Sequence, residues 1–289
     1  MPEGRHHRRA SNDSALDEGN EKHPVLRGQH PEAGSPVLIN KVAASLEAAV
    51  AGIKDGSTIM IGGFGTAGMP AELIDALIAQ GATALTMISN DAGNAETGLA
   101  ALLKAKRVRK IVCSFPRQSD SWVFDGLYRA GEIALELVPQ GTLAERIRAA
   151  GAGIGAFFTP TGYGTQLAEG KETRIIDGRP HLLEFALPAD VALIKAHRAD
   201  RWGNLVYRKA ARNFGPIMAT AARCTIAQVS GIVDLGALDP QTIVTPGFFV
   251  GTPLCRSAPN EGQQVGASAC GPRPRAARMR VVYTRRLRM

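Results

Sequence analysis

The stretch TIMIGGFGTAGMPAELIDAL, residues 58–77, joins a short apolar run to an amphipathic one through a segment rich in glycine. Residues 58–61 have the length and composition of a buried strand, and residues 70–80 have the apolar spacing of a helix. Proline is favoured at the first helical position and excluded from helix interiors, so we expect the helix to begin at Pro70. Gly62 to Met69 is then a loop, in which glycines leave backbone N–H groups open to a ligand.

The same loop contains a formal G-x-G-x-x-G motif, Gly63 to Gly68. In a dinucleotide-binding turn the helix begins within the motif, so that its N-terminus faces the pyrophosphate. Here Pro70 delays the helix, although Asp91 stands where a ribose contact would be wanted. A nicotinamide-dinucleotide-binding oxidoreductase therefore remains only a remote alternative, and a plain strand-to-helix connection is a further one.

Outward from this stretch, short apolar segments alternate with amphipathic ones. Strands are expected at 84–89, 110–114 and 133–138, and helices at 42–53, 97–105, 120–129 and 142–150. Continuously apolar strands alternating with helices predict an α/β fold with an open, mainly parallel sheet covered by helices. Beyond residue 159 the pattern changes to hairpins, with strands expected at 173–176 and 181–185 around Asp177-Gly178. Further strands are expected at 191–196, 205–207 and 225–229, and a short helix at 217–222. The sequence thus predicts an antiparallel extension of the sheet.

Composition and charge narrow the classes of function. The chain has 289 residues, is 45% hydrophobic and carries a net charge of +8, but eight arginines and a single acidic residue lie in residues 251–289. The nearly neutral main body therefore does not favour a nucleic-acid partner. No C-x-x-C spacing or histidine cluster predicts a metal site. No long apolar stretch or signal peptide predicts a membrane association, so we expect a cytoplasmic protein.

Three regions differ in composition. Residues 1–38 are polar and without apolar periodicity, and are expected to be disordered or an extension from an upstream start. Residues 39–250 are expected to form the folded domain. Residues 251–289 form an atypical tail rich in arginine and proline, in which no strand or helix is expected and whose composition a frameshift would explain.

Several long motifs resemble the A subunit of the two-subunit 3-oxoacid CoA-transferases over about residues 39–250. These motifs are DGSTIMIGGFGTAGMP (55–70), SNDAG (89–93), PQGTLAERIRAAGAGIGAFFTPTGYGT (139–165), AEGKETR (168–174) and GNLVYRKAARNF (203–214). Within the family, VCSFPRQSDSWVFDGLYRAGEI (112–133) is most similar to the enzymes of aromatic degradation that use succinyl-CoA and 3-oxoadipate. Enzymes that use acetoacetate are the alternative within the same class. A sugar-phosphate-sensing regulator on a related fold has little support, because no helix-turn-helix is apparent.

The resemblance implies a CoA transfer between carboxylates through a glutamate that forms first a mixed anhydride and then a thioester with CoA. It places this glutamate in a Ser-Glu-Asn-Gly motif of the B subunit, and that motif is absent here. We therefore expect half of an enzyme, whose partners are the CoA-transferase B subunit, succinyl-CoA and 3-oxoadipate. The CoA thioester is a substrate, so no cofactor is expected.

The same resemblance implies the residues of the site. Each chemical step passes through an oxyanion, which needs fixed donors in a site closed to water. Asn90 and Gln140 match polar positions that face the glutamate and the substrate, and both follow expected strands. Asp91 stands where family members usually have Asn, which puts a donor role of that residue in doubt. The loop residues expected to approach CoA are Gly62, Gly63, Phe64, Gly65 and Gly68.

Several of these residues also have purely structural interpretations. Arg117 is expected to bind the second carboxylate of the substrate, but a solvated surface arginine fits the sequence equally well. Gln140 also fits a cap of the helix expected at 142. Arg212 fits a buried structural ion pair. The basic run Lys104 to Lys110 fits the exposed end of a helix, with CoA phosphates as an alternative.

Overall fold

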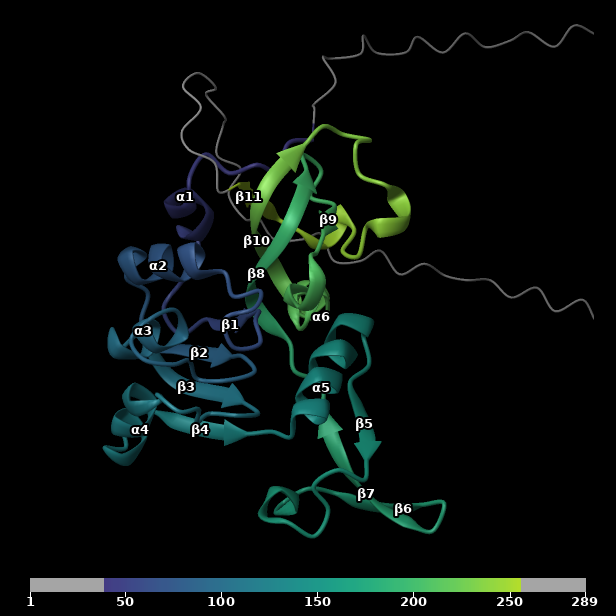
Figure 1. Cartoon of the computed structure of the whole chain (residues 1–289). Coiled ribbons are helices and arrows are strands. Elements are labelled where there is room, and N and C mark those ends of the chain that lie inside the picture. The colour runs from purple at the N-terminus through teal and green to yellow at the C-terminus, as the bar shows by residue number, and fades with distance from the viewer. Residues whose placement is uncertain (1–38, 256–289) are drawn as a thin grey trace, which may run out of the picture. The chain divides into compact units, whose positions relative to one another are not determined.

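A computed structural model describes residues 39–255 of the chain (Figure 1). The predictions for residues 1–38 and for residues 256–289 lie outside the described residues. The helices are α1 (Leu46–Val50), α2 (Ala71–Gln80), α3 (Leu99–Lys104), α4 (Trp122–Arg129), α5 (Gln140–Ala152) and α6 (Gly215–Ala221). The strands are β1 (Thr58–Ile61), β2 (Leu85–Ile88), β3 (Val108–Cys113), β4 (Ala134–Leu137), β5 (Ala156–Thr159), β6 (Thr173–Ile176), β7 (Arg179–Phe185), β8 (Ala189–Asp200), β9 (Leu205–Val206), β10 (Ala222–Val233) and β11 (Thr252–Cys255).

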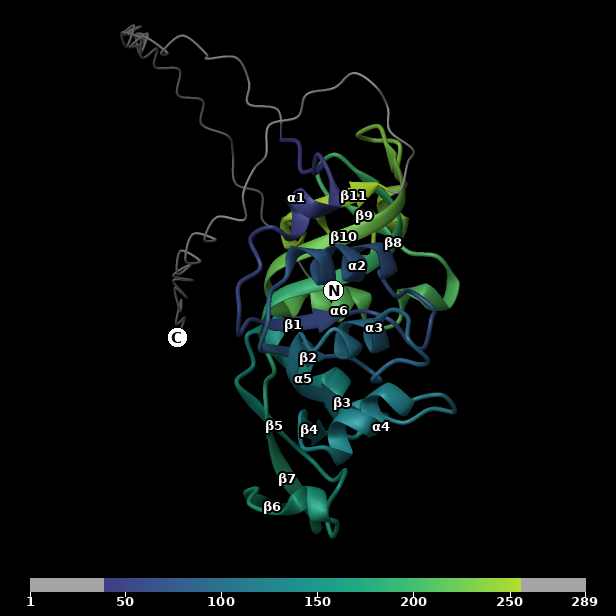
Figure 2. The same cartoon turned by 90° about the vertical axis from the view of Figure 1, so that its left-hand side faces the viewer.

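The main sheet has the order β11-β10-β8-β1-β2-β3-β4, and every neighbouring pair in this order is parallel. Within the described residues, β9 is the antiparallel strand of this sheet and pairs with β8. The side chains of β1 alternate between the two faces, so that Ile59 and Ile61 belong to one apolar cluster and Met60 to the other. The first cluster includes α1 to α4 and the second includes α5 and α6. Figure 1 shows these two groups of helices on opposite sides of the sheet, and in Figure 2 α2, α3 and α4 lie in front of it. The predicted α/β fold with a helix-covered parallel sheet is confirmed.

The predicted antiparallel extension is a separate sheet with the order β5-β7-β6. Its hairpin turns at Asp177-Gly178, both with positive φ (49° and 72°), as the sequence predicted. Strand β5 was not predicted, because its four residues are too few for a period and it pairs with β7, which lies far along the chain. Figure 1 shows this sheet extending from the end of α5.

The two ends of the described chain differ from the predictions. Helix α1 is shorter than the expected 42–53, because the Ser45 side chain caps it by accepting a hydrogen bond from the N–H of Ala48 (3.1 Å). The expectation of no strand beyond residue 250 does not hold for β11, which pairs with β10 in parallel. Pro253 lowers the strand propensity of this segment, but β11 is an edge strand, where proline is tolerated.

None of the helices in residues 39–255 has the length and apolar content needed to cross a membrane.

Candidate active site

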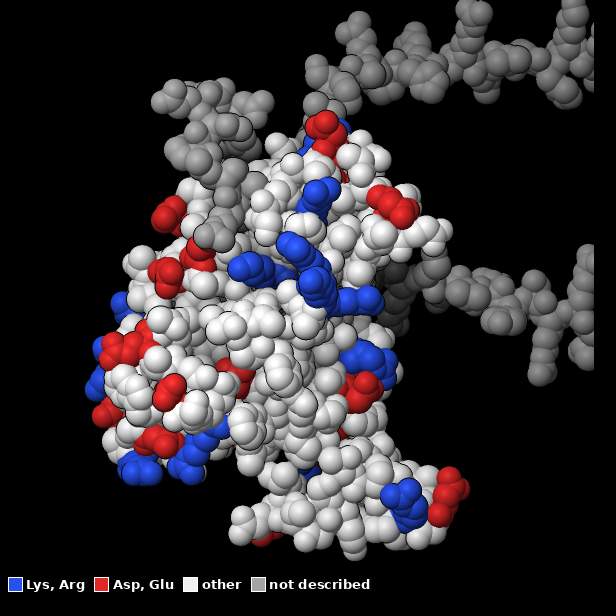
Figure 3. All heavy atoms as spheres, in the orientation of Figure 1, with Lys and Arg blue, Asp and Glu red and all other residues white. Residues whose placement is uncertain are grey.

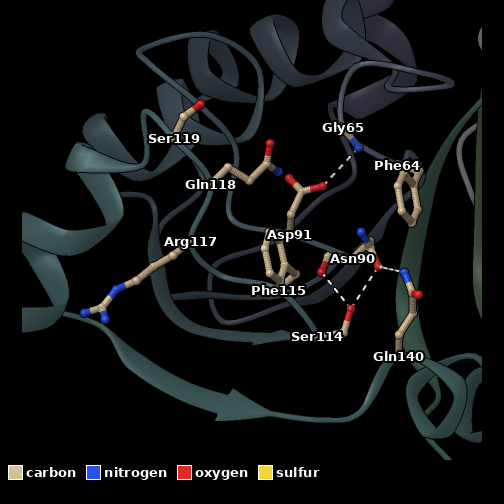
Figure 4. Close-up of a pocket in the computed structure, with 10 residues that line it drawn as sticks. All are labelled: Phe64, Gly65, Asn90, Asp91, Ser114, Phe115, Arg117, Gln118, Ser119 and Gln140. Carbon is tan, nitrogen blue, oxygen red and sulfur yellow. Dashed lines mark hydrogen bonds between the residues drawn. The ribbon is translucent and has the colours of Figure 1, made fainter.

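The carboxyl ends of β1, β2, β3 and β4 meet at one edge of the main sheet, where open α/β sheets place their ligands. The residues that follow these four strands line a cavity of about 700 Å³. Its lining residues, all drawn in Figure 4, are Phe64, Gly65, Asn90, Asp91, Ser114, Phe115, Arg117, Gln118, Ser119 and Gln140. The fold therefore brings Asn90 and Gln140 together although they are distant along the chain.

The side chain of Asn90 is held in one orientation by two donors to its carbonyl oxygen Oδ1. Gln140 Nε2 donates to it at 2.7 Å and Ser114 Oγ at 2.8 Å (Figure 4). Asn90 is only 4% exposed, and its Nδ2 group has no hydrogen-bond partner among residues 39–255. Since Oδ1 is fully engaged, the two Nδ2 hydrogens are the donors that Asn90 presents to the cavity. An amide held in this way can serve as a preorganised donor to an oxygen that gains negative charge.

Gln140 is the first residue of α5, and its side chain makes no capping hydrogen bond to that helix. The capping interpretation is therefore wrong, and it failed because α5 begins two residues earlier than the expected 142. Instead the side chain reaches back across the edge of the sheet to Asn90. This hydrogen bond helps to fix the orientation of the Asn90 side chain.

Asp91 anchors the glycine loop. Its carboxylate accepts hydrogen bonds from the backbone N–H groups of Gly65 (3.1 Å) and Gly93 (2.9 Å), and the residue is only 3% exposed. Each of its two oxygens is thereby bonded inside the protein. The acidic side chain is accommodated because two backbone donors stabilise it.

Several backbone N–H groups of the glycine loop form hydrogen bonds within the protein and are not donors to the cavity. The N–H of Gly62 donates to Leu193 O, that of Phe64 to Ala67 O and that of Gly65 to Asp91. Of the predicted loop residues, Phe64 and Gly65 line the cavity, whereas Gly62, Gly63 and Gly68 do not. Helix α2 begins only at Ala71, so these glycines do not form a helix N-terminus of the dinucleotide-binding type.

Gly68 packs directly against the segment that follows β9. Its φ is +77°, and a Cβ built there would lie 2.6 Å from the carbonyl oxygen of Ala211. Both the backbone conformation and the close contact require glycine. Neighbouring Ala67 is tied to the same segment, because Asn213 Nδ2 donates to Ala67 O at 2.8 Å.

Gly68→Ala is therefore expected to destabilise the protein by about 2 kcal/mol, the sum of a strained positive φ and a displaced backbone. The melting temperature should fall by about 5 °C. Gly52→Ala is the matched control, because a Cβ at Gly52 meets no atom within 4 Å. Equal melting temperatures for the two variants would contradict the close-packing argument.

Arg117 lies at the cavity but its guanidinium points away from the other lining residues (Figure 4). Its Nε donates to Asp125 Oδ1 at 2.6 Å, and its side chain is 57% exposed. The exposed ion pair is weak, so the side chain is free to turn at small cost. Arg117 is thus neither a solvated lone arginine nor a group already directed at a substrate.

The other basic residues singled out in the sequence have different surroundings. Lys104, Lys106 and Lys110 form ion pairs with Glu96, Glu132 and Glu136 respectively. Three of the five basic residues of the run therefore have an acidic partner, which does not favour the alternative that the run binds phosphates. Arg212 is exposed and forms no ion pair with a residue in 39–255, so the interpretation as a buried ion pair is wrong.

Cys113 ends β3 close to the cavity, but its thiol is not a nucleophile. Burial, and secondly the negative charge of Asp91, raise the pKa of Cys113 to about 12. At neutral pH the thiolate is therefore negligibly populated. No group of three or more potential metal ligands occurs in the described part of the chain.

Four lining residues were not predicted, namely Ser114, Phe115, Gln118 and Ser119. Ser114 was the most informative omission, because it follows β3 just as Asn90 follows β2. The polar residue at the end of an apolar strand is the signal that identifies such positions. Gln118 and Ser119 lie in an irregular segment, for which the sequence offers no periodicity.

Comparisons with known proteins identify the family of the chain. The sequence profile of the coenzyme A transferase family matches residues 43–252. The chain is 73% identical to the A subunit of the 3-oxoadipate CoA-transferase of Pseudomonas putida over 74% of this chain and 92% of that protein. It is 65% identical to the protein of the same name from Acinetobacter baylyi, over 74% of this chain and 93% of that protein. Among solved structures, the glutaconate coenzyme A-transferase of Acidaminococcus fermentans has the same fold, with a TM-score of 0.65, 21% identity and coverage of 74% of this chain and 75% of that chain. This chain therefore belongs to the coenzyme A transferase family.

Proposed function

We propose that this chain is the A subunit of a heteromeric transferase that moves CoA from succinyl-CoA to 3-oxoadipate. The relatives from Pseudomonas putida and Acinetobacter baylyi are named as the A subunit of 3-oxoadipate CoA-transferase. The observation that carries the proposal is the Asn90 amide, which Gln140 and Ser114 orient toward the cavity. A cytoplasmic location stays a prediction from the sequence.

The part of the cavity formed by the described residues does not hold a competent nucleophile. The carboxylate among its lining residues is that of Asp91, and both oxygens of Asp91 already accept backbone hydrogen bonds. Ser114 Oγ donates to Asn90, and neither Ser114 nor Ser119 is hydrogen-bonded to a basic side chain in 39–255 that could activate it. We infer that the nucleophile is a glutamate of the partner, the B subunit.

Two aromatic side chains that line the cavity are exposed. Phe64 is 54% exposed and Phe115 is 59% exposed, and both line the cavity. Large exposed aromatic side chains at the edge of a site are typical of surfaces covered by a partner. The B subunit, placed over these rings, would exclude water from the site and so prevent hydrolysis of the activated intermediates.

The chemistry follows from these positions. The glutamate carboxylate attacks the thioester carbon of succinyl-CoA, and the CoA thiolate leaves to give a mixed anhydride. The thiolate then attacks the glutamyl carbon, which releases succinate and leaves CoA bound as an enzyme thioester. Attack by the 3-oxoadipate carboxylate and return of the thiolate reverse these two steps. Asn90 Nδ2 stabilises the oxyanion formed at each attack.

Substrate choice gives the direct test of this proposal. In a complex with the B subunit, kcat/KM is expected to be larger for 3-oxoadipate than for acetoacetate. A larger kcat/KM for acetoacetate would favour the acetoacetate-using alternative instead. Saturable binding of NAD, with no CoA transfer to either acceptor, would contradict both.

Arg117 provides a prediction about this specificity. 3-Oxoadipate has a second carboxylate that acetoacetate lacks, and Arg117 can bind it only by leaving Asp125. Arg117→Gln is expected to lower kcat/KM for 3-oxoadipate about tenfold, and to leave kcat/KM for acetoacetate unchanged. Arg129→Gln, at an exposed position of α4, is the control. An equal loss with both acceptors would exclude a role in recognising the second carboxylate.

A further inference from the structure

A second cavity, of about 370 Å³, is lined in part by the glycine loop. Its lining residues are Gly68, Lys195, Ala196, His197, Arg208, Lys209, Ala211 and Ser230. They come from the loop after β1, from β8 and β10, and from the 3-10 helix Lys209–Arg212 with the residue before it. We refer to this site as the basic cavity.

The cations of the basic cavity are not neutralised by the described part of the protein. Lys195, Arg208 and Lys209 form no ion pair with any residue in 39–255, and the lining includes no acidic residue from that range. This differs from the run Lys104 to Lys110, in which three lysines have an acidic partner. Figure 3 shows Lys and Arg side chains gathered over the region of β8, β9 and β10. Clustered cations with no acidic partner raise the local concentration of anions.

The basic cavity and the candidate active site are connected through the glycine loop. Gly65 lines the first cavity and Gly68 lines the second, so the two lining positions are at most about 11 Å apart along the loop. Asn213 Nδ2 joins the loop to the basic segment by donating to Ala67 O (2.8 Å) and to Ala210 O (2.9 Å). The same loop thus contributes lining residues to both cavities.

We propose that the basic cavity binds the phosphate groups of CoA while the thioester reaches the cavity at Asn90. The proposal rests on the function proposed above, because it concerns the same substrate. CoA carries its phosphates at one end and its sulfur at the other end of a long flexible arm. Lys195, Arg208 and Lys209 can donate charge-assisted hydrogen bonds to phosphate oxygens, and arginine can do so with two parallel bonds.

The test uses the complex of this chain with the B subunit. Lys195→Gln, Arg208→Gln, Lys209→Gln and the triple variant are compared with Lys54→Gln, an exposed lysine in the turn before β1. Each single variant is expected to raise the KM of succinyl-CoA, and the Kd of CoA measured by calorimetry, about tenfold. The value of kcat and the KM of the acceptor acid should stay unchanged, as should every constant of Lys54→Gln.

Three ligands identify what the cavity recognises. Succinyl-pantetheine lacks the phosphates, so its KM should be the same for the wild type and the triple variant. 3′-Dephospho-CoA shows whether the 3′-phosphate contributes to the loss. Inorganic phosphate should compete only weakly, because it lacks the rest of CoA.

The outcomes are distinguishable from a failure of the proposed function. An unchanged KM and Kd in the triple variant would overturn the proposal, and so would an equal loss with succinyl-pantetheine. Inorganic phosphate that binds as tightly as CoA would show a general anion site and would also overturn it. If the wild-type complex transfers no CoA, the proposed function fails, while the Kd of CoA for the variants still decides the role of the basic cavity.

Discussion

Asn90→Ala is expected to lower kcat/KM for CoA transfer about 10²- to 10³-fold, the usual loss for one oxyanion donor. The physical reason is that the Nδ2 group is held by two hydrogen bonds to Oδ1 and need not reorganise as charge develops. The loss should fall mainly on kcat, since the interaction strengthens in the transition state. The measurement is a full kinetic profile of the complex with the B subunit.

Gln140→Ala and Ser114→Ala are the companion variants, because each removes one of the two bonds that orient Asn90. Each is expected to lower kcat about tenfold, with the other bond retained. The fold should tolerate Asn90→Ala, since the backbone bonds from Ser114 and Phe115 to Asn90 O do not involve its side chain. A loss confined to KM in Asn90→Ala would contradict the oxyanion role.

Asp91→Ala should have the largest effect on stability. It removes the acceptor of two charge-assisted hydrogen bonds and leaves the N–H groups of Gly65 and Gly93 unpaired. The expected loss is about 3 kcal/mol in the free energy of unfolding, or about 9 °C in the melting temperature. The glycine loop would lose its anchor, so kcat/KM should also fall.

Asp91→Asn separates the anchoring role from the charge. Its single carbonyl oxygen can keep one of the two bonds, so its loss of stability should be about half that of Asp91→Ala. Thermal unfolding of both variants, beside the wild type, measures this difference. Equal stability of Asp91→Ala and the wild type would show that the carboxylate does not hold the loop.

Local pattern controls the parts of the fold that could be predicted. Strand β1 has the predicted bounds and α2 begins one residue after the predicted Pro70, because apolar runs and a proline specify them locally. Strand β5 was missed because its partner, β7, lies beyond an intervening hairpin strand. Pairing of that kind depends on tertiary contacts and leaves little trace in four residues.

In the candidate site, too, local features could be predicted and tertiary contacts could not. The positions of Asn90 and Gln140 at strand ends were predictable, since parallel strands bring their carboxyl ends to one edge. The sequence did not predict the hydrogen bond between these two side chains or the turn of Arg117 toward Asp125. It also did not predict that the loop N–H groups form hydrogen bonds within the protein. Side-chain orientation depends on neighbours that only the folded chain brings together.

Whether this chain is half of a CoA-transferase is best decided by the rate of CoA transfer from succinyl-CoA to 3-oxoadipate. This rate should be measured for the purified chain alone and after co-expression with a B subunit that carries the Ser-Glu-Asn-Gly glutamate. We expect transfer only in the complex, and its loss when that glutamate is replaced by glutamine. Transfer by the chain alone would contradict the proposed function, because the cavity at Asn90 would then have to contain a nucleophile of its own.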